Sequence, residues 1–172
     1  MRQSGWAAMW DDPAETERLV LTSYEEVRDG VVRIAACAKR SITILTPDLE
    51  LGIYDSPEFL DAVKRLVLAK RYARVRVLIS EPERTVRNGN RLIALGRRLN
   101  THLDFRNLDE DYRGKLTGAF IIADESAVLY RTDGRRYDGI MGTIEPAIAR
   151  QHLREFEKPW EVSAYQIPVA QL

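Results

Sequence analysis

The sequence predicts an α/β fold in which a mixed, largely parallel sheet is flanked by helices. Short β-branched, apolar segments alternate with longer segments of helical apolar spacing between residues 19 and 106. This alternation favours parallel strands that are joined by right-handed helical crossovers. Two apolar runs within residues 119–130 are separated by a short polar turn, which indicates an antiparallel hairpin in the same sheet.

The chain length, 172 residues, suits one domain with a sizeable core. We expect that domain at residues 18–163, between an N-terminal tail at 1–17 and a C-terminal tail at 164–172. The composition is 45% hydrophobic and 30% charged, which is typical of a globular protein and argues against long disorder. Trp6 and Trp10 in the N-terminal tail are expected to dock on the domain itself or on a partner.

The predicted strands are rich in β-branched and other apolar residues. Pro47 ends the second strand, because proline cannot donate a hydrogen bond to a sheet ladder. Asp124, Glu125 and Ser126 form the turn of the hairpin. In chain order, the expected strands are residues 19–21, 41–46, 75–79, 103–106, 119–123 and 127–130.

The predicted helices are recognised by capping residues and by apolar residues on one face. Ser23 and Glu26 form a capping box before the first helix, and Ser56 precedes Pro57 at the start of the second. Residues 88–90, Asn-Gly-Asn, interrupt the third helix and can delay its start. The expected helices cover about 24–39, a segment from 57 onwards, about 84–100 and about 144–157.

The cysteine content and the hydropathy of the sequence indicate in which cellular compartment the protein is expected. Cys37 is the only cysteine, so an internal disulfide is excluded, and we interpret it as a small apolar side chain in a reducing environment. No segment approaches the roughly 18 apolar residues of a membrane span, and the N-terminus lacks a secretory hydrophobic region. We therefore expect a cytoplasmic protein without a membrane span. No spacing of His, Cys, Asp and Glu indicates a metal, and nothing in the sequence implies a cofactor.

The net charge of zero conceals an uneven distribution. Residues 1–62 carry a net charge of −6, residues 63–115 carry +8 and residues 116–172 carry −2. Four arginines of the third predicted helix fall within about 60° of each other on a helical wheel. They form either a solvated face whose stems cover the edge of the core or a surface that follows phosphates. These arginines are Arg84, Arg87, Arg91 and Arg98.

Residues 113–131, RGKLTGAFIIADESAVLYR, resemble the signature segment of the phospholipase D superfamily. In that family a His, one residue, a Lys, four residues and an Asp are followed by a short strand. The segments ITILTP and VRVLIS and the pair Phe156 and Trp160 are also similar to the family pattern. The resemblance covers roughly residues 18–163 and implies a phospholipase D-like fold.

The sequence departs from the family at the catalytic positions. Thr117 stands where the resemblance places the His, Ala119 stands where it places the Lys, and only Asp124 matches. A threonine hydroxyl without a base is a poor nucleophile, and alanine has no charge to hold phosphate, so we predict that the chain is not an enzyme. The family's downstream Gly-Ser-x-x-Asn segment aligns on Arg131, Thr132 and Arg135, and arginine there can keep anion binding without hydrolysis.

Three hypotheses of function follow. The first is a catalytically inactive module that binds a phosphate-bearing ligand, above all nucleic acid. The second is a scaffold for self-association, as a homodimer, or for another protein. The third is a phosphodiesterase in which the catalytic groups are relocated to His102 and Asp124. The other histidine, His152, is expected to pack on the inner face of the last helix. The candidate binding residues are Arg84, Arg87, Arg91, Arg98, Lys115, Arg131, Thr132, Arg135 and Arg136.

Overall fold

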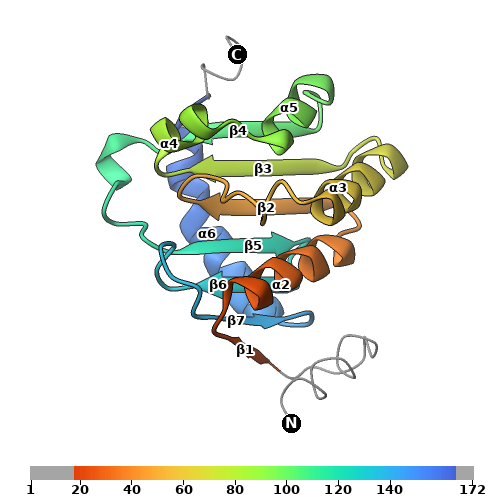
Figure 1. The fold of residues 1–172 in the computed structure, drawn as a ribbon, viewed down its shortest axis with the longest axis vertical. Helices are drawn as coiled ribbons and strands as arrows, with labels where there is room; N and C mark the ends of the chain where they lie inside the picture. The colour runs from red at the N-terminus through yellow and green to blue at the C-terminus, as the bar shows by residue number, and fades with distance from the viewer. Residues whose placement is uncertain (1–17, 166–172) are drawn as a thin grey trace.

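A computed structural model describes residues 18–165, apart from the side chains of residues 86–88 and 165. Figure 1 shows a sheet with helices on both faces. The sheet has eight strands in the order β1-β7-β6-β5-β2-β3-β4-β8. The predicted α/β class with a mixed sheet is confirmed. The N-terminal tail, with Trp6 and Trp10, and the last seven residues of the chain lie outside the described residues.

Three neighbouring strands of the sheet are parallel. Strands β2 (Ser41–Thr46), β3 (Arg74–Ile79) and β4 (Leu103–Asn107) lie side by side in that order, and both of their pairings are parallel. Ile44 and Val77 on these strands are fully buried. Helices cover both faces of parallel strands, which explains their continuous apolar sequences.

The remaining strands pair in antiparallel fashion. The predicted hairpin is present as β5 (Ala119–Ala123) and β6 (Ala127–Arg131), with β5 antiparallel to β2. Three further strands extend the sheet: β7 (Gly139–Gly142), β1 (Leu19–Leu21) and β8 (Ala164–Tyr165). Antiparallel pairings outnumber the parallel ones, so the expectation of a largely parallel sheet is wrong. The sequence did not predict β7, which has a glycine at each end, or β8, which is too short to show a period.

The helices are unequally divided between the two faces (Figure 1). Helices α2 (Tyr24–Cys37), α3 (Pro57–Ala69) and α5 (Arg91–Arg98) pack on one face and share the larger apolar core. Helix α6 (Pro146–Val162) packs on the other, where Phe156 and Trp160 meet Leu45 and Leu78 of the sheet. None of the helices among the described residues is long and apolar enough to cross a membrane.

Local capping fixes the first two helices. The Ser23 side chain accepts a hydrogen bond from the Glu26 N–H at 3.1 Å, as predicted. The Glu26 carboxylate accepts from the Thr22 N–H at 2.8 Å, and this hydrogen bond lowers the pKa of Glu26. Ser56 caps α3 by accepting from the Phe59 N–H at 3.2 Å. Helix α2 ends at Cys37, two residues earlier than predicted.

The single helix predicted at residues 84–100 is wrong. The structure has α4 (Pro82–Asn88) and α5, separated at Gly89, whose φ of 71° lies in the left-handed region. Asn90 then caps α5, because its side-chain oxygen accepts from the N–H groups of Leu92 and Ile93 at 2.8 and 3.3 Å. The predicted stripe of four arginines is therefore divided between two helices.

Asp124, the one family position that matches, lies in the turn between β5 and β6. Its carboxylate accepts hydrogen bonds from the backbone N–H groups of Lys39, Arg40 and Ser41 at 2.8–3.2 Å. Its φ of 58° is left-handed, which aspartate tolerates better than most residues. Asp124 thus fastens the hairpin to the start of β2.

We predict that Asp124→Ala lowers the free energy of unfolding by about 3 kcal/mol, because three N–H groups lose a charged acceptor and alanine is strained at this φ. Urea denaturation measures the change. Glu125→Ala in the same exposed turn is the control, with an expected change within about 0.5 kcal/mol. Equal effects of the two substitutions would contradict the anchoring role of Asp124.

Candidate functional site

The carboxyl ends of the parallel strands β2 and β3 meet at one edge of the sheet. Pro47 and Asp48 directly follow β2, and Ser80 and Glu81 directly follow β3. Ligands of open α/β sheets commonly bind at such an edge. Because β5 is antiparallel to β2, the chain enters β5 at this same edge, at Thr117.

A cleft of about 470 Å³ opens at this edge. Its walls come from the ends of β2 and β3 and from two loops, one before β5 and one after β6. The lining residues are Pro47, Ser80, Glu81, Arg113, Gly114, Leu116, Thr117, Asp133 and Arg135. The volume is within the range of small-molecule pockets.

The three positions of the family signature are not brought together. Thr117 lines the cleft, and its carbonyl accepts a hydrogen bond from the Gly134 N–H at 2.8 Å. Ala119 is fully buried at the start of β5. Asp124 lies at the opposite edge of the sheet, since β5 runs the length of its neighbour β2. Only Thr117 can therefore touch a ligand in the cleft.

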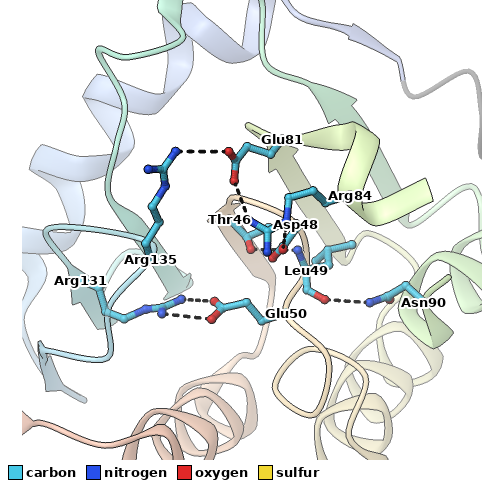
Figure 2. Close-up of polar contacts among 9 residues, drawn as sticks. All are labelled: Thr46, Asp48, Leu49, Glu50, Glu81, Arg84, Asn90, Arg131 and Arg135. Carbon is cyan, nitrogen blue, oxygen red and sulfur yellow. Dashed lines mark hydrogen bonds and ion pairs between the residues drawn. The ribbon is translucent and has the colours of Figure 1, made fainter. Parts of the chain in front are cut away.

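Ion pairs connect the charged groups around the cleft, as Figure 2 shows. Glu81 lies 3.5 Å from a nitrogen of Arg84 and 3.5 Å from a nitrogen of Arg135. Asp48 pairs with Arg84 at 3.3 Å. Burial raises the pKa of Asp48, and Arg84 opposes that rise. Within the described residues, the Oδ1 atom of Asp48 has no hydrogen-bond partner.

Arg131 has a different place from the one predicted. Its side chain is 1% exposed and forms an ion pair with Glu50 (Figure 2), and it donates to the Arg136 carbonyl at 2.9 Å. Burial acts to lower the pKa of Arg131, but the hydrogen bond with Glu50 and the electrostatic interactions with Tyr54, Glu50 and Tyr137 together outweigh burial, and the pKa is raised. A guanidinium that is buried and paired in this way holds the protein together and does not face a ligand.

The other predicted binding residues are scattered. Arg135 lines the cleft, and the exposed Arg136 pairs with Asp138 at 2.9 Å. Lys115 and Thr132 line a smaller pocket of about 150 Å³, which shares Thr117 with the cleft.

The predicted stripe contributes little to the cleft. Arg84 is held by Asp48 and Glu81. Arg91 and Arg98 are exposed on α5 and do not line the cleft, and the side chain of Arg87 lies outside the described residues. Among the three whose side chains are described, only Arg84 approaches the strand ends.

Sequence reasoning missed Glu50, Glu81 and Arg113. Arg113 lines the cleft and pairs with Glu83 at 3.2 Å. A signal for Glu81 was present, because it follows a predicted strand by two residues and ligand sites gather at the carboxyl ends of parallel strands. Glu50 gave no such signal, since its partner is 81 residues away.

His102 and Asp124 do not form the relocated catalytic pair of the third hypothesis. His102 lies before β4 and its Nδ1 is 2.9 Å from the Ala73 carbonyl oxygen. Asp124 ends β5, and the strand order β5-β2-β3-β4 separates the two by about 14 Å at the usual strand spacing. That proposed pair is therefore wrong.

His152 packs inward on α6 as predicted. Its ring centroid lies 4.2 Å from that of Tyr130 and 5.4 Å from that of Phe120. Burial lowers the pKa of His152, and Glu155 opposes this effect. Elsewhere in residues 18–165, no group of three or more His, Cys, Asp and Glu side chains could hold a metal ion.

Comparisons with known proteins identify a family and a fold. A family model described as "Domain of unknown function (DUF7931)" matches residues 23–172. No curated protein matches the sequence significantly.

Among solved structures, the chain is similar to Nuc, a phospholipase D family member from Salmonella typhimurium. The identity is 19% and the TM-score 0.61, over 88% of this chain and 98% of Nuc. NucT from Helicobacter pylori has 14% identity and a TM-score of 0.58, over 88% of this chain and 99% of NucT.

TrmBL2, an archaeal chromatin protein with "a novel mode of DNA binding", has 13% identity and a TM-score of 0.61, over 95% of this chain and 62% of TrmBL2. Identities this low show the fold alone. The predicted phospholipase D-like fold is confirmed.

The buried ion pair predicts a large loss of stability when one partner is removed. Arg131→Met should lower the free energy of unfolding by about 3 to 5 kcal/mol, because Glu50 would keep a partly buried charge without its partner. Arg135→Met, at a side chain that is 76% exposed, should change it by about 0.5 kcal/mol or less. Urea denaturation compares the two, and a neutral Arg131→Met would show that Arg131 is not structural.

Proposed function

The chain belongs to the family described as domain of unknown function DUF7931, and within its phospholipase D-like fold we propose that it is a catalytically inactive module that binds nucleic acid through the phosphate backbone. The observation that carries this proposal is the cleft at the carboxyl ends of β2 and β3, with exposed cations on the two loops beside it. Arg135 and Arg136 are 76% and 70% exposed. Arg113 and Lys115 stand on the other loop.

Two of these cations, Arg135 and Arg136, can exchange their carboxylate partners for a phosphate. Arg135 and Arg136 have carboxylate partners, Glu81 and Asp138, but exposed ion pairs contribute only about 0 to 1 kcal/mol each. A phosphate oxygen can replace such a partner and receive two guanidinium N–H groups at once. Nucleic acid adds the release of condensed counterions, which favours binding at low salt.

The proposed lack of catalysis rests on the lining of the cleft. Thr117 offers a hydroxyl to the cleft, and no histidine is among the described residues that line this cleft. His152 lines the neighbouring smaller pocket, where its ring is packed against Tyr130. Both the attack on phosphorus and protonation of the leaving group would need a positioned acid or base.

One structural neighbour supports a nucleic-acid ligand. TrmBL2 is described as an archaeal chromatin protein with a novel mode of DNA binding. Tyr137 is exposed but its ring is engaged edge-on with Tyr24 at 5.6 Å. Because an aromatic platform for bases is lacking around the cleft in the described residues, we propose backbone binding without sequence preference.

A second candidate function is self-association. Val20 on β1 and Ile140 on β7 are 51% and 46% exposed and face each other across the strand pair. Exposed apolar side chains at a sheet edge favour pairing with another surface. A salt-insensitive dimer in light scattering, together with no binding of nucleic acid, would favour this candidate.

Anisotropy titration of labelled single- and double-stranded oligonucleotides at about 50 and about 200 mM salt tests the first proposal. We expect binding that weakens steeply with salt, and Arg135→Gln with Arg136→Gln should reduce the slope of log K against log salt by about 2. The double variant Lys70→Gln, Arg71→Gln, at exposed cations after α3, is the matched control and should bind as the unmodified chain does.

The probe is examined on a gel after each titration. No binding at low salt would overturn the nucleic-acid proposal. A cut probe would overturn the lack of catalysis, and His152→Phe would then test whether the histidine beside the cleft is responsible.

Glu81 competes with the ligand for Arg135. Removing its charge with Glu81→Gln should release Arg135 and strengthen oligonucleotide binding about threefold to tenfold at low salt, which corresponds to about 0.7 to 1.4 kcal/mol. Glu58→Gln, which removes an exposed carboxylate paired with Arg28 at 3.4 Å, is the control. Unchanged or weaker binding by Glu81→Gln in the same titration would contradict the competition.

A further inference from the structure

The face of the sheet below α6 changes character along its strands. Toward the carboxyl ends of β2 and β3 it is apolar, with Leu45 and Leu78 under Phe156 and Trp160. Toward their amino ends, β2 and β3 bear polar side chains instead. A sheet face that lies under a helix is normally apolar, so this polar part needs an explanation.

The polar part is a row across three strands. Thr43 is opposite Arg76, and Arg76 is opposite Asp104, so the three residues are neighbours in register. Ser41 precedes Thr43 by two residues and is therefore on the same face. Thr43 is 2% exposed, so the row includes a buried polar side chain.

A cleft of about 480 Å³ lies between this row and α6. The helix contributes residues at positions 150, 153, 154 and 157, a spacing that places them on one helix face. The lining residues are Ser41, Thr43, Arg76, Asp124, Glu125, Arg150, Leu153, Arg154 and Glu157. The cleft is at the amino ends of β2 and β3, about 17 Å along the strands from the cleft described above, by the rise of a six-residue strand.

Several charges in this cleft are already matched. Arg76 pairs with Glu157 through two contacts of 2.9 and 3.1 Å, and its guanidinium is 4.9 Å from the centre of the Phe156 ring. Asp124 is occupied by three backbone N–H groups. A ligand could bind either group only by displacing these partners.

Arg150 and Arg154 are different. Both are exposed, they lie one turn apart on α6, and no carboxylate in residues 18–165 forms an ion pair with either. Two guanidiniums at the wall of a cleft with two hydroxyls on its floor form a site for an anion with several acceptor oxygens.

We propose that this cleft binds a small phosphomonoester, whose phosphate is held by Arg150 and Arg154 on the wall of the cleft and by Ser41 and Thr43 on its floor. A phosphomonoester carries a charge of about −2 near neutral pH, which equals the charge of the two guanidiniums with the opposite sign. The cleft volume of about 480 Å³ is within the range of small-molecule pockets, so the cleft suits a small ligand. The site is independent of the proposed nucleic-acid function, because the two clefts share no lining residue.

NMR titration of the 172-residue chain with inorganic phosphate tests the site. We expect shifts of the Ser41 and Thr43 amide signals with a dissociation constant in the roughly millimolar range, as suits so small a probe. The double variant Arg150→Gln, Arg154→Gln should weaken phosphate binding by about tenfold or more. Lys158→Gln removes a cation from the same helix outside the cleft and should have no such effect, and Arg135→Gln should leave this site unchanged.

Equal weakening by Lys158→Gln would reduce the effect to general charge and overturn the site. Phosphate binding that leaves the Ser41 and Thr43 signals unmoved would also overturn it. Succinate serves as the second probe, because a dicarboxylate has the same charge without phosphate geometry. Succinate binding as tight as phosphate binding would overturn the assignment to phosphomonoesters, and weaker succinate binding would support it.

Discussion

The ion pair between Arg131 and Glu50 constrains the edge of the sheet that carries the main cleft. A guanidinium that is 1% exposed must have a charged partner, and Glu50 supplies it from the loop after β2. That loop is itself strained, since Leu49 has a φ of 53° and is held by the hydrogen bond from Asn90 to its carbonyl at 3.0 Å. Burial also raises the pKa of Tyr54 in the same loop, so this side chain stays uncharged beside the ion pair. The loop after β2 is thereby held between β6 and α5, so one wall of the main cleft has a fixed position.

The chemistry available at this edge follows from how its charges are used. Arg131 serves the interior, Arg84 is shared by Asp48 and Glu81, and Arg135 on its loop is the most exposed of the three. A ligand that enters must exchange partners with these exposed pairs, because each cation there already has a carboxylate nearby. A ligand at an edge of this kind binds reversibly, and its affinity depends on the salt concentration. Hydrolysis would need a positioned acid or base at Thr117.

The sequence predicted the fold better than the site because the two depend on different ranges of interaction. The hairpin at residues 119–131 was predicted correctly, since strand periodicity and a polar turn are local properties. The prediction of a single arginine stripe was wrong, because the left-handed conformation of Gly89 divides the expected helix into two. The role of Arg131 could not be predicted, because its partner Glu50 is distant in sequence and no local sequence pattern indicates that the two residues form an ion pair.

The small pocket and the polar cleft beside α6 have a common geometric cause. The eight strands span about 34 Å at the usual spacing, whereas an α-helix with its side chains is about 10 to 12 Å wide. On the face that α6 covers alone (Figure 1), much of the sheet must therefore remain beside the helix and not beneath it. His152 and Glu155 of α6 border the small pocket on one flank, and Arg150 and Arg154 border the polar cleft on the other. A single helix across a wide sheet thus leaves an exposed flank at each end of the parallel strands, and the side chains of these flanks are under less pressure to be apolar than those of the core.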